Sequence, residues 1–418
     1  MFGRARRCFA RSRPFLNRDF QLLWIGETLS ELGSQSSTVA YPLLVLALTG
    51  SPARAGIVGL AKWLPLAIFS LPAGVLADRV DRKRLMIGCD AVRLLGAASI
   101  VFALVLAHPT FLQIVAVAFL DGGLSITSYI AERGALGQVV SGDQLPDAVA
   151  ANEARAYAAG IVGPSLGGAL FAAARSLPFL ADALSFTCST VAIASTRTAF
   201  QHPREPSSER PLREIMEGFA WLRAHPFYRA TALLFAVGNP MFTALALLAI
   251  LLVRQNQASP ATIGVMLTLG SVGGLLGAAF AGPLRRRFSA RALIAFGPWL
   301  ALAVVLLLLV VKLPLLIGVL LAVSEFPAPA TNAVVAGSRV AAAPDHLQGR
   351  VQAAASTLAM SLAWLGPLAV GVLFQQGGGT ATILALAAWT TALALAATCT
   401  PSIRHDSPDT RPAAAQDP

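Results

Sequence analysis

Long apolar runs separated by short polar segments make up the chain from about residue 20 to residue 400. A helix needs about 20 mostly apolar residues to cross the hydrocarbon core of a bilayer. Dividing the runs at charged residues and at clusters of proline and glycine predicts an all-α membrane protein with twelve transmembrane helices. The expected helices lie near residues 20–48, 55–77, 85–107, 110–132, 148–174, 177–198, 229–253, 260–282, 290–311, 313–337, 350–375 and 379–400.

The longest polar segment between these runs divides the predicted helices into two sets of six. Its first part is rich in proline and serine, which is typical of a linker. From Leu212 to Leu222, apolar residues recur at spacings of three and four, which predicts an amphipathic helix on the membrane surface. The expected organisation is a basic cytoplasmic tail (1–18), a six-helix half (19–198), a cytoplasmic linker with this helix (199–228), a second six-helix half (229–400) and a disordered tail (401–418).

The composition agrees with a membrane protein. Of the 418 residues, 56% are hydrophobic and 13% are charged, whereas soluble domains carry about 25% charged residues. The four cysteines lie far apart in the sequence and have no histidine partners, so neither a disulfide framework nor a metal site is expected. The sequence contains no nucleotide-binding lysine loop and no nucleophile motif. We therefore expect no enzyme activity and no cofactor.

The distribution of positive charge predicts the orientation in the membrane. With the N-terminus in the cytoplasm, 27 of the 32 lysines and arginines fall on the cytoplasmic side and four on the other side. Such an imbalance indicates that both termini are cytoplasmic. The net charge of +11 is thus explained by arginines that flank the spans and contact anionic lipid headgroups, and no nucleic-acid partner is expected.

The two halves repeat each other in sequence. "AGVLADRVDRKRLMIG" at 73–88 corresponds to "AGPLRRRFSARALIAFG" at 281–297, an offset of 208 residues. The segments that lead into the fifth and eleventh spans correspond at an offset of about 203 residues. Two six-helix halves that both begin inside form a parallel repeat about an axis along the membrane normal, with a central cavity between the halves.

The stretch "GVLADRVDRKR" resembles the signature of the loop between the second and third spans of the major facilitator superfamily. The matching residues are Gly74, Asp78, Arg79, Arg82 and Lys83, and Arg84 adds a further charge. The resemblance implies a transporter that works by alternating access, with this loop as a cytoplasmic gate. Gly74 is expected to let two helices approach closely, and Asp78 to pair with an arginine or cap a helix. The alternative is a plain positively charged loop.

The stretch "GIVGPSLGG" resembles the fifth-span signature of drug exporters, with matches at Gly163, Pro164, Gly167 and Gly168. Further strings, at 17–34, 48–56, 142–152 and 345–351, resemble the enterobactin-exporter and macrolide-efflux branch of the drug:proton antiporters. The resemblance implies export of a small amphipathic compound such as a siderophore or antibiotic. The alternative for the fifth span is a packing helix with a proline kink.

Ionisable residues inside predicted spans are candidates for proton coupling, because a charge in the membrane is costly and is retained for function. These candidates are Glu27, Glu31, Asp121 and Glu325. Glu27 and Glu31 lie four residues apart and share one helix face. The alternative for Asp121 is a buried pair with Arg93, whose neighbour Asp90 offers a second pairing. Lys62 is expected to extend its side chain to the outer membrane surface.

Polar, aromatic and methionine side chains inside the spans are candidates for a substrate cavity. They are Gln35, Tyr41, Trp63, Tyr129, Phe235, Asn239, Met241, Phe242, Phe326, Asn332 and Trp364. The hypothesis is a monomeric, multi-pass transporter of the bacterial plasma membrane that exports a small molecule in exchange for protons. Two alternatives remain: an uptake permease or uniporter for a metabolite, and a membrane scaffold or receptor that transports nothing.

Overall fold

The computed structural model describes residues 14–201 and 211–405, and all regular secondary structure in these residues is helical. The first half contains η1 (Pro14–Leu16), α2 (Arg18–Thr49), α3 (Pro52–Arg79), α4 (Arg82–Val105), α5 (Phe111–Val139), α6 (Leu145–Ala173) and α7 (Leu177–Ala194). The second half contains α8 (Pro211–Ala224), α9 (Pro226–Gln255), α10 (Pro260–Arg287), α11 (Ala290–Leu307), α12 (Pro314–Glu325), α13 (Ala328–Ala342), η2 (Asp345–Leu347), α14 (Gln348–Met360), α15 (Leu365–Cys399) and α16 (Pro401–His405).

The helices begin where short polar side chains precede the apolar runs. A side-chain oxygen at the N-cap accepts a hydrogen bond from a backbone N–H of the first turn and so satisfies a donor that has no partner within the helix. Such caps are made by Asn17, Ser51, Asp81, Thr110, Ser259 and Ser289. Proline then follows in the first turn of α3, α9 and α10, where its missing N–H costs nothing.

Ten helical stretches among the described residues are long and apolar enough to cross a membrane. The predicted spans 313–337 and 350–375 are each interrupted: α12 and α13 are separated at Phe326–Pro327, and α14 and α15 at residues 361–364. Within α15, Gly378 has φ 71° and ψ −172°, so the chain turns there between two helical segments. A positive φ is readily available only to glycine.

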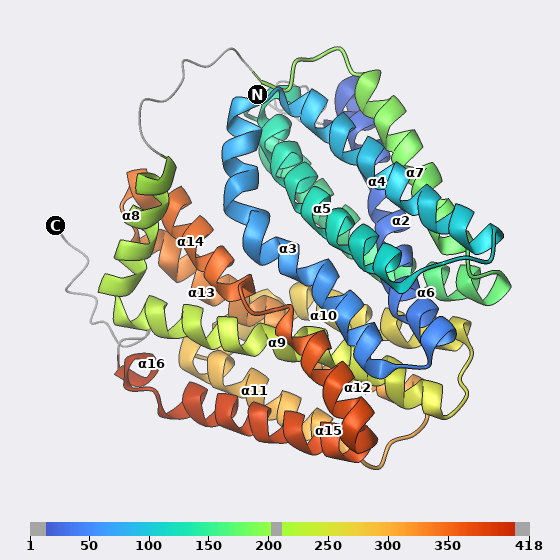
Figure 1. Cartoon of the computed structure of the whole chain (residues 1–418). Coiled ribbons are helices and arrows are strands. Elements are labelled where there is room, and N and C mark those ends of the chain that lie inside the picture. The colour runs from blue at the N-terminus through green and yellow to red at the C-terminus, as the bar shows by residue number, and fades with distance from the viewer. Residues whose placement is uncertain (1–13, 202–210, 406–418) are drawn as a thin grey trace, which may run out of the picture.

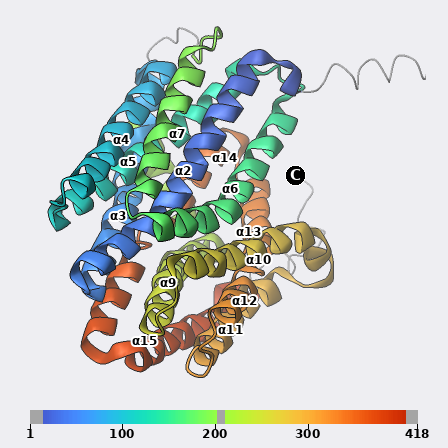
Figure 2. The same ribbon diagram turned by 90° about the vertical axis from the view of Figure 1, so that its right-hand side faces the viewer.

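The two halves lie side by side and meet at one end of the molecule (Figures 1 and 2). One buried apolar cluster at that end joins helices of both halves; Val45, Leu248 and Val370 are among its members. At the opposite end, each half has a separate cluster, around Met86 in the first half and around Val351 in the second. The halves are therefore closed against each other at one end and separate at the other.

Two glycine crossings hold the closed end together. Where α6 crosses α10, a Cβ on Gly168 would lie 2.4 Å from the Pro260 oxygen, and one on Gly264 would lie 2.4 Å from the Pro164 oxygen. Only glycine permits helices to approach this closely.

The second crossing joins α15 to α3 and repeats the first. A Cβ on Gly371 would lie 2.5 Å from the Pro52 oxygen, and one on Gly56 would lie 2.6 Å from the Pro367 oxygen. Gly56 and Gly264 differ by 208 positions, and Gly168 and Gly371 by 203, which are the offsets of the sequence repeat. The repeat therefore appears in the fold as a pair of equivalent contacts between the halves.

The structure confirms a helix in the central segment. α8 packs against α14: a Cβ on Gly218 would lie 2.3 Å from the Arg350 oxygen, and Glu217 pairs with Arg350. Its position on the membrane surface stays a prediction. In the C-terminal tail, the expectation of disorder is wrong for Pro401–His405, which form α16. The predicted tail 1–18 and linker lie partly, and residues 406–418 entirely, outside the described residues.

Candidate functional site

A polar cavity of about 280 Å³ lies within the first half, between α2, α3, α4 and α5. Three successive turns of α2 contribute glutamates and small hydroxyl residues to one wall, and α5 forms much of the opposite wall. The lining residues are Glu27, Ser30, Glu31, Ser34, Gln35, Thr38, Lys62, Trp63, Leu66, Arg93, Gly122, Ser125, Ile126, Ser128, Tyr129 and Glu132. Carboxylates, hydroxyls and two aromatic rings thus face one space.

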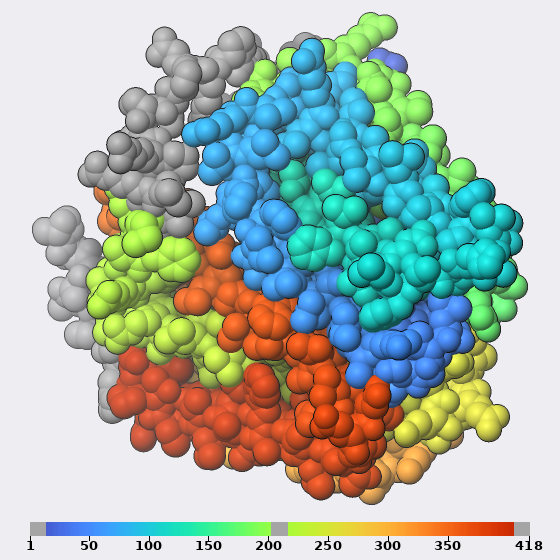
Figure 3. All heavy atoms as spheres, viewed as in Figure 1, coloured from blue at the N-terminus to red at the C-terminus, as the bar shows by residue number. Residues whose placement is uncertain are grey.

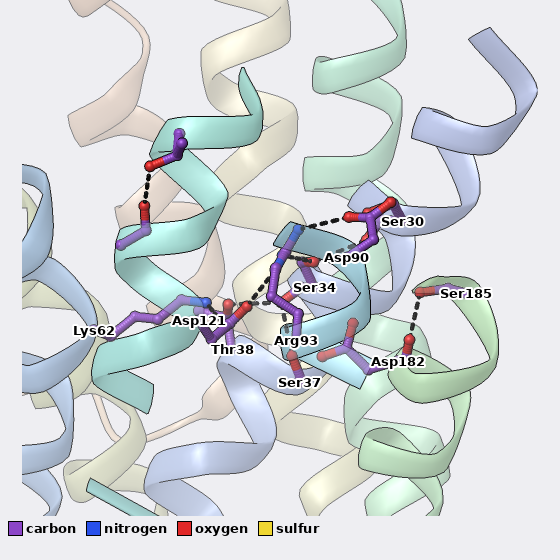
Figure 4. Close-up of polar contacts among 12 residues, drawn as sticks. Ser30, Ser34, Ser37, Thr38, Lys62, Asp90, Arg93, Asp121, Asp182 and Ser185 are labelled. Carbon is purple, nitrogen blue, oxygen red and sulfur yellow. Dashed lines mark hydrogen bonds and ion pairs between the residues drawn. The ribbon is translucent and has the colours of Figure 1, made fainter. Parts of the chain in front are cut away.

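Asp121 is the centre of a charge network beside this cavity (Figure 4). Its Oδ1 lies 2.8 Å from Arg93 Nε, and its Oδ2 pairs with Lys62 Nζ. Arg93 also donates to Ser34 Oγ at 2.7 Å, lies 3.7 Å from the Asp90 carboxylate, and covers the Phe186 ring at 4.2 Å. The network therefore joins five helices of the first half.

Two expectations for these residues are decided by the structure. The pairs of Arg93 with Asp121 and Asp90 are confirmed. The expectation that Lys62 extends to the outer surface is wrong, because its ammonium group reaches the buried Asp121 carboxylate instead. The attraction between the two opposite charges offsets part of the cost of burying each of them in apolar surroundings.

Glu27 and Glu31 face the cavity from α2 without a basic partner. Glu31 Oε1 accepts a hydrogen bond from Gln35 Nε2 at 2.9 Å. Glu27 Oε1 is buried, and no hydrogen-bond partner for it is found among the described residues. Neither carboxylate forms an ion pair within that part of the chain. Because a buried polar atom without a partner is costly, this site is suited to receive a proton or a positively charged group.

A second buried ion pair was not predicted from the sequence. Arg155 on α6 holds the Glu132 carboxylate of α5 through two contacts, at 2.8 and 3.0 Å, and both side chains are about 5% exposed or less. Asn152 adds a donor at 3.0 Å. The sequence signal was an acid at the end of the predicted span 110–132 and a base inside the predicted span 148–174, but a single sequence does not contain the contact between them.

A buried arginine in the second half was missed in the same way. Arg339 on α13 is 7% exposed and donates to Gln352 on α14 at 3.1 and 2.6 Å. The charge count had included Arg93, Arg155 and Arg339 among the 27 positive charges expected on the cytoplasmic side, whereas the structure buries all three side chains. Without them, 24 charges remain on the expected cytoplasmic side against four on the other.

The loop between α3 and α4 forms its contacts within the first half. Arg82 pairs with Asp78 at 3.2 Å and donates to the Gly134 carbonyl at 2.7 Å, and Lys83 donates to the carbonyl oxygens of Ala194 and Thr196. The loop thus fastens α3 and α4 to α5 and α7. The pairing predicted for Asp78 is confirmed.

The role expected for Gly74 is contradicted in this conformation. A Cβ at Gly74 would meet no atom within 4 Å, so the residue is not at a close helix approach. In contrast, the glycines of the fifth-span signature are at such approaches. A Cβ at Gly163 would lie 2.3 Å from Gln35 Cβ, and one at Gly167 would lie 2.4 Å from the Ser36 oxygen.

Pro164 does not interrupt α6, which runs continuously from Leu145 to Ala173. Its carbonyl oxygen instead faces Gly264 of the second half at the first glycine crossing.

The predicted cavity residues separate into two groups. Gln35, Trp63 and Tyr129 line the cavity. The others lie elsewhere. Tyr41 is buried against Phe179, and Met241 lies in the apolar cluster at the closed end. Phe235 packs against the cluster around Val351 in the second half. Among the remaining side chains, Asn239 donates to Ala359 O, Trp364 donates to Ser361 O, Phe326 contacts Phe280, and Phe242 and Asn332 are exposed.

Glu325 ends α12 at the break before Pro327 and is half-buried. It lies in the second half, apart from the cavity of the first half. Within 14–201 and 211–405, no group of three or more histidine, cysteine, aspartate or glutamate side chains could hold a metal ion.

Two repeated helical halves that meet at one end and hold a polar cavity are the architecture of a major facilitator superfamily transporter. A crystal structure of a variant of the nucleoside transporter NupG has a TM-score of 0.72 at 11% identity, covering 91% of this chain and 99% of that chain. The model of the family described as "Transmembrane secretion effector" matches residues 10–417, so the chain belongs to this family.

Other comparisons agree with this class. A bacterial homologue of the iron transporter ferroportin, in an inward-facing state, has a TM-score of 0.67 at 16% identity and covers 90% of this chain and 98% of that chain. The multidrug efflux pump Tap of Mycolicibacterium fortuitum is 29% identical over 389 residues, which are 89% of this chain and 93% of that protein. The enterobactin exporter EntS of Escherichia coli O1:K1 / APEC is 25% identical over 268 residues, 63% of each chain.

These relatives are transporters rather than enzymes, and this chain is a multi-pass protein of the bacterial inner membrane.

Proposed function

We propose that this protein exports a small amphipathic compound, such as an antibiotic or a siderophore, in exchange for protons. The likeness to Tap and EntS supports export of a compound of this kind. The proposal includes twelve spans, both termini in the cytoplasm and a monomeric protein. The count of twelve takes α2 as the first span, α12 with α13 as the tenth, and divides α14–α15 at Gly378 into the last two.

Alternating access is supported by the unequal ends of the molecule. With cytoplasmic termini, the closed end with its two glycine crossings faces outward, and the end with separate clusters faces the cytoplasm. This arrangement corresponds to an inward-open state. In the opposite state the crossings separate and the loop between α3 and α4 approaches the second half, where Arg79, Arg84 and their neighbours supply charge.

One observation carries the proton role: Glu27 and Glu31 face the cavity without basic partners. Three neighbouring acids are balanced instead, because Lys62 and Arg93 neutralise Asp121 and Asp90, and Arg155 neutralises Glu132. A proton or a cationic substrate supplies the missing positive charge at the glutamate pair, and the two compete there. Such competition couples the movement of one to the movement of the other. Asp121 and Glu325 serve as secondary sites that bind or relay protons.

The test uses purified protein in liposomes that contain a pH-sensitive dye. A pH gradient is imposed, and antibiotics and siderophores are added one at a time. We expect substrate-triggered proton movement, which Glu31→Gln lowers by tenfold or more and Glu27→Gln lowers less. Glu153→Gln is the matched control, because Glu153 pairs with Arg133 at an exposed site outside the cavity and its change leaves the coupling intact.

Two results would contradict parts of the proposal. Substrate flux without proton movement would retain transport and remove the proton roles. Accumulation against a gradient in the uptake direction would contradict export and indicate a permease. If no compound in a broad panel moves, the non-transporting alternative is favoured.

A further inference from the structure

A large apolar cavity lies away from the space between the halves. It has a volume of about 860 Å³ and is a groove between α9 and the second part of α15, with α16 at one end. All its lining residues come from these three helices and from Thr400, which joins α15 to α16. Figure 3 shows α9 and α15 at the molecular surface on the side viewed in Figure 1. Because both helices cross the membrane, the groove opens toward lipid.

The groove exists because the two halves differ at equivalent positions. In the first half, α2 packs directly on α7: a Cβ on Gly26 would lie 3.0 Å from Ala192 Cβ, and one on Gly33 would lie 2.8 Å from Asp182 Oδ1. The offset of 208 residues places Leu234 and Met241 at the corresponding positions of α9. A branched or long side chain keeps neighbouring helices apart where glycine brings them together.

On the facing helix the side chains change size in the opposite direction, from larger in the first half to smaller in the second. In α7, Asp182 and Ser189 approach the two glycines of α2. The offset of 203 residues places Ala385 and Ala392 at these positions of α15, and both line the groove together with Leu234. Small side chains on α15 thus oppose large ones on α9, and the space between them is left unfilled.

The dimensions of the groove match one leaflet of a bilayer. Its α9 wall runs from Pro226 to Val237, about 16 Å at 1.5 Å per residue. Half of a hydrocarbon core of about 30 Å is about 15 Å. Trp389 forms the far end of the groove, where its Nε1 donates to the Val237 oxygen at 3.1 Å. The groove can therefore hold an acyl chain of the leaflet on the side of α16.

The other end of the groove is polar and positively charged. Arg229, Thr400 and Ser402 line it. Arg229 is exposed and donates to the Arg223 carbonyl at 2.9 Å, and Arg404 is exposed on α16 beside the buried Ile403. The guanidinium groups of Arg229 and Arg404 thus lie at the end of the groove formed by α16, near the level of lipid headgroups, where each attracts an anionic headgroup.

We propose that this groove is a binding site for an anionic phospholipid, with an acyl chain between α9 and α15 and the headgroup at Arg229 and Arg404. The charge complementarity and the one-leaflet length select a lipid rather than a transported substrate. The site is independent of the proposed export function, because no residue that lines the polar cavity of the first half contributes to it.

The test uses the intrinsic fluorescence of Trp389. The full chain, purified in detergent, is mixed with phosphatidylglycerol or phosphatidylcholine that carries brominated acyl chains, which quench nearby tryptophans. The protein has six tryptophans, so the contribution of Trp389 is obtained as the difference from Trp389→Phe. We expect phosphatidylglycerol to quench Trp389 at lower concentration than phosphatidylcholine, by about fivefold for each contributing arginine.

Two variants with matched controls decide the result. Arg229→Gln is expected to reduce the preference for phosphatidylglycerol about fivefold, and Arg287→Gln, at an exposed helix end outside the groove, to leave it unchanged. Ala392→Phe fills the groove and is expected to abolish quenching of Trp389 by either lipid. Ala388→Phe, exposed on the same helix but outside the groove lining, keeps it.

Three results would overturn the proposal: equal quenching by the two lipids, quenching that persists in Ala392→Phe, or an equal loss in Arg229→Gln and Arg287→Gln. Each of these quenching results is measured on protein that elutes as a single species, and none of them requires that transport be observed.

Discussion

Two ion pairs joining α5 and α6 allow burial to be compared at nearly identical positions. Glu132 and Arg155 are about 5% exposed or less, whereas the neighbouring Arg133 and Glu153 are 58% and 52% exposed at the same 2.8 Å separation. Removing one partner of a buried pair leaves an uncompensated charge, but an exposed partner is simply hydrated by water. The two pairs are therefore expected to differ in how much the free energy of unfolding falls when one partner is removed.

Arg155→Met is expected to destabilise the protein by about 3–5 kcal/mol, because it leaves Glu132 charged and buried. Arg133→Met, the matched control, is expected to cost at most about 1 kcal/mol. Thermal unfolding in detergent measures both. The double variant Arg155→Met with Glu132→Leu is expected to recover most of the stability; equal losses in both single variants would show that burial of the pair is unimportant.

Individual charges were only partly predictable from the sequence. Glu27 and Glu31 stand inside a long apolar run, so their position in the membrane follows from hydropathy alone. Arg155 and Arg339 were counted with the charges that flank the spans, because the sequence does not distinguish an exposed arginine near a helix end from one whose side chain is buried against a neighbouring helix. The partner of Lys62 could not be predicted, because Asp121 lies on another helix and a single sequence does not contain that contact.

At the scale of helices, the glycines of α10 differ sharply in their surroundings. A Cβ on Gly264 would collide with the Pro164 oxygen of the other half, whereas one on Gly274, ten residues along the same helix, would meet nothing within 4 Å. The two positions separate the effect of the crossing from the general effect of glycine on a helix.

Gly264→Ala is expected to open the closed end, because the added methyl group cannot fit against a backbone atom. A cysteine introduced at the fully buried Met266 reports this opening through its reaction with a water-soluble thiol reagent. We expect the reaction to be several-fold faster with Gly264→Ala than without it. Gly274→Ala should leave the rate unchanged, and an equal rate in all three proteins would show that the crossing does not control the closed end.

The helices themselves were predictable in position, because hydropathy and caps act locally. The breaks inside the tenth and eleventh predicted spans were not, although Pro327 gave a signal within the first of them. An apolar run has the same hydropathy whether its helix is straight or interrupted. Packing against neighbouring helices decides between the two. The groove between α9 and α15 was also beyond prediction, since it depends on side chains of two helices that are far apart in sequence.

For the whole molecule, the arrangement makes relative movement of the halves the central hypothesis. Ser165 on α6 and Thr268 on α10 lie across the closed end, with their hydroxyl oxygens 2.7 Å apart. Ser99 on α4 and Gln113 on α5 both belong to the first half, with Ser99 Oγ 3.2 Å from Gln113 Nε2. One pair therefore spans the two halves and the other does not.

A disulfide between cysteines at positions 165 and 268 is expected to abolish transport, and reduction to restore it, because the closed end must separate in each cycle. A disulfide between positions 99 and 113 is the control and is expected to leave transport nearly unchanged. Substrate flux in liposomes under oxidising and reducing conditions measures both. Full activity of the first cross-linked protein would contradict alternating access by movement of the halves.

The glycine crossings also bear on how strongly the two conformations differ in free energy. Each crossing directs two glycine Cα–H groups at proline carbonyl oxygens, and a contact of this kind contributes about 0.5–1 kcal/mol. Four of them supply only about 2–4 kcal/mol, which is the range of free-energy differences at which a minor conformation stays populated at about 0.1–10%. The main-chain part of the closure therefore adds only a few kcal/mol to the apolar contacts that join the halves at this end, an amount that the binding of a single substrate or proton can offset.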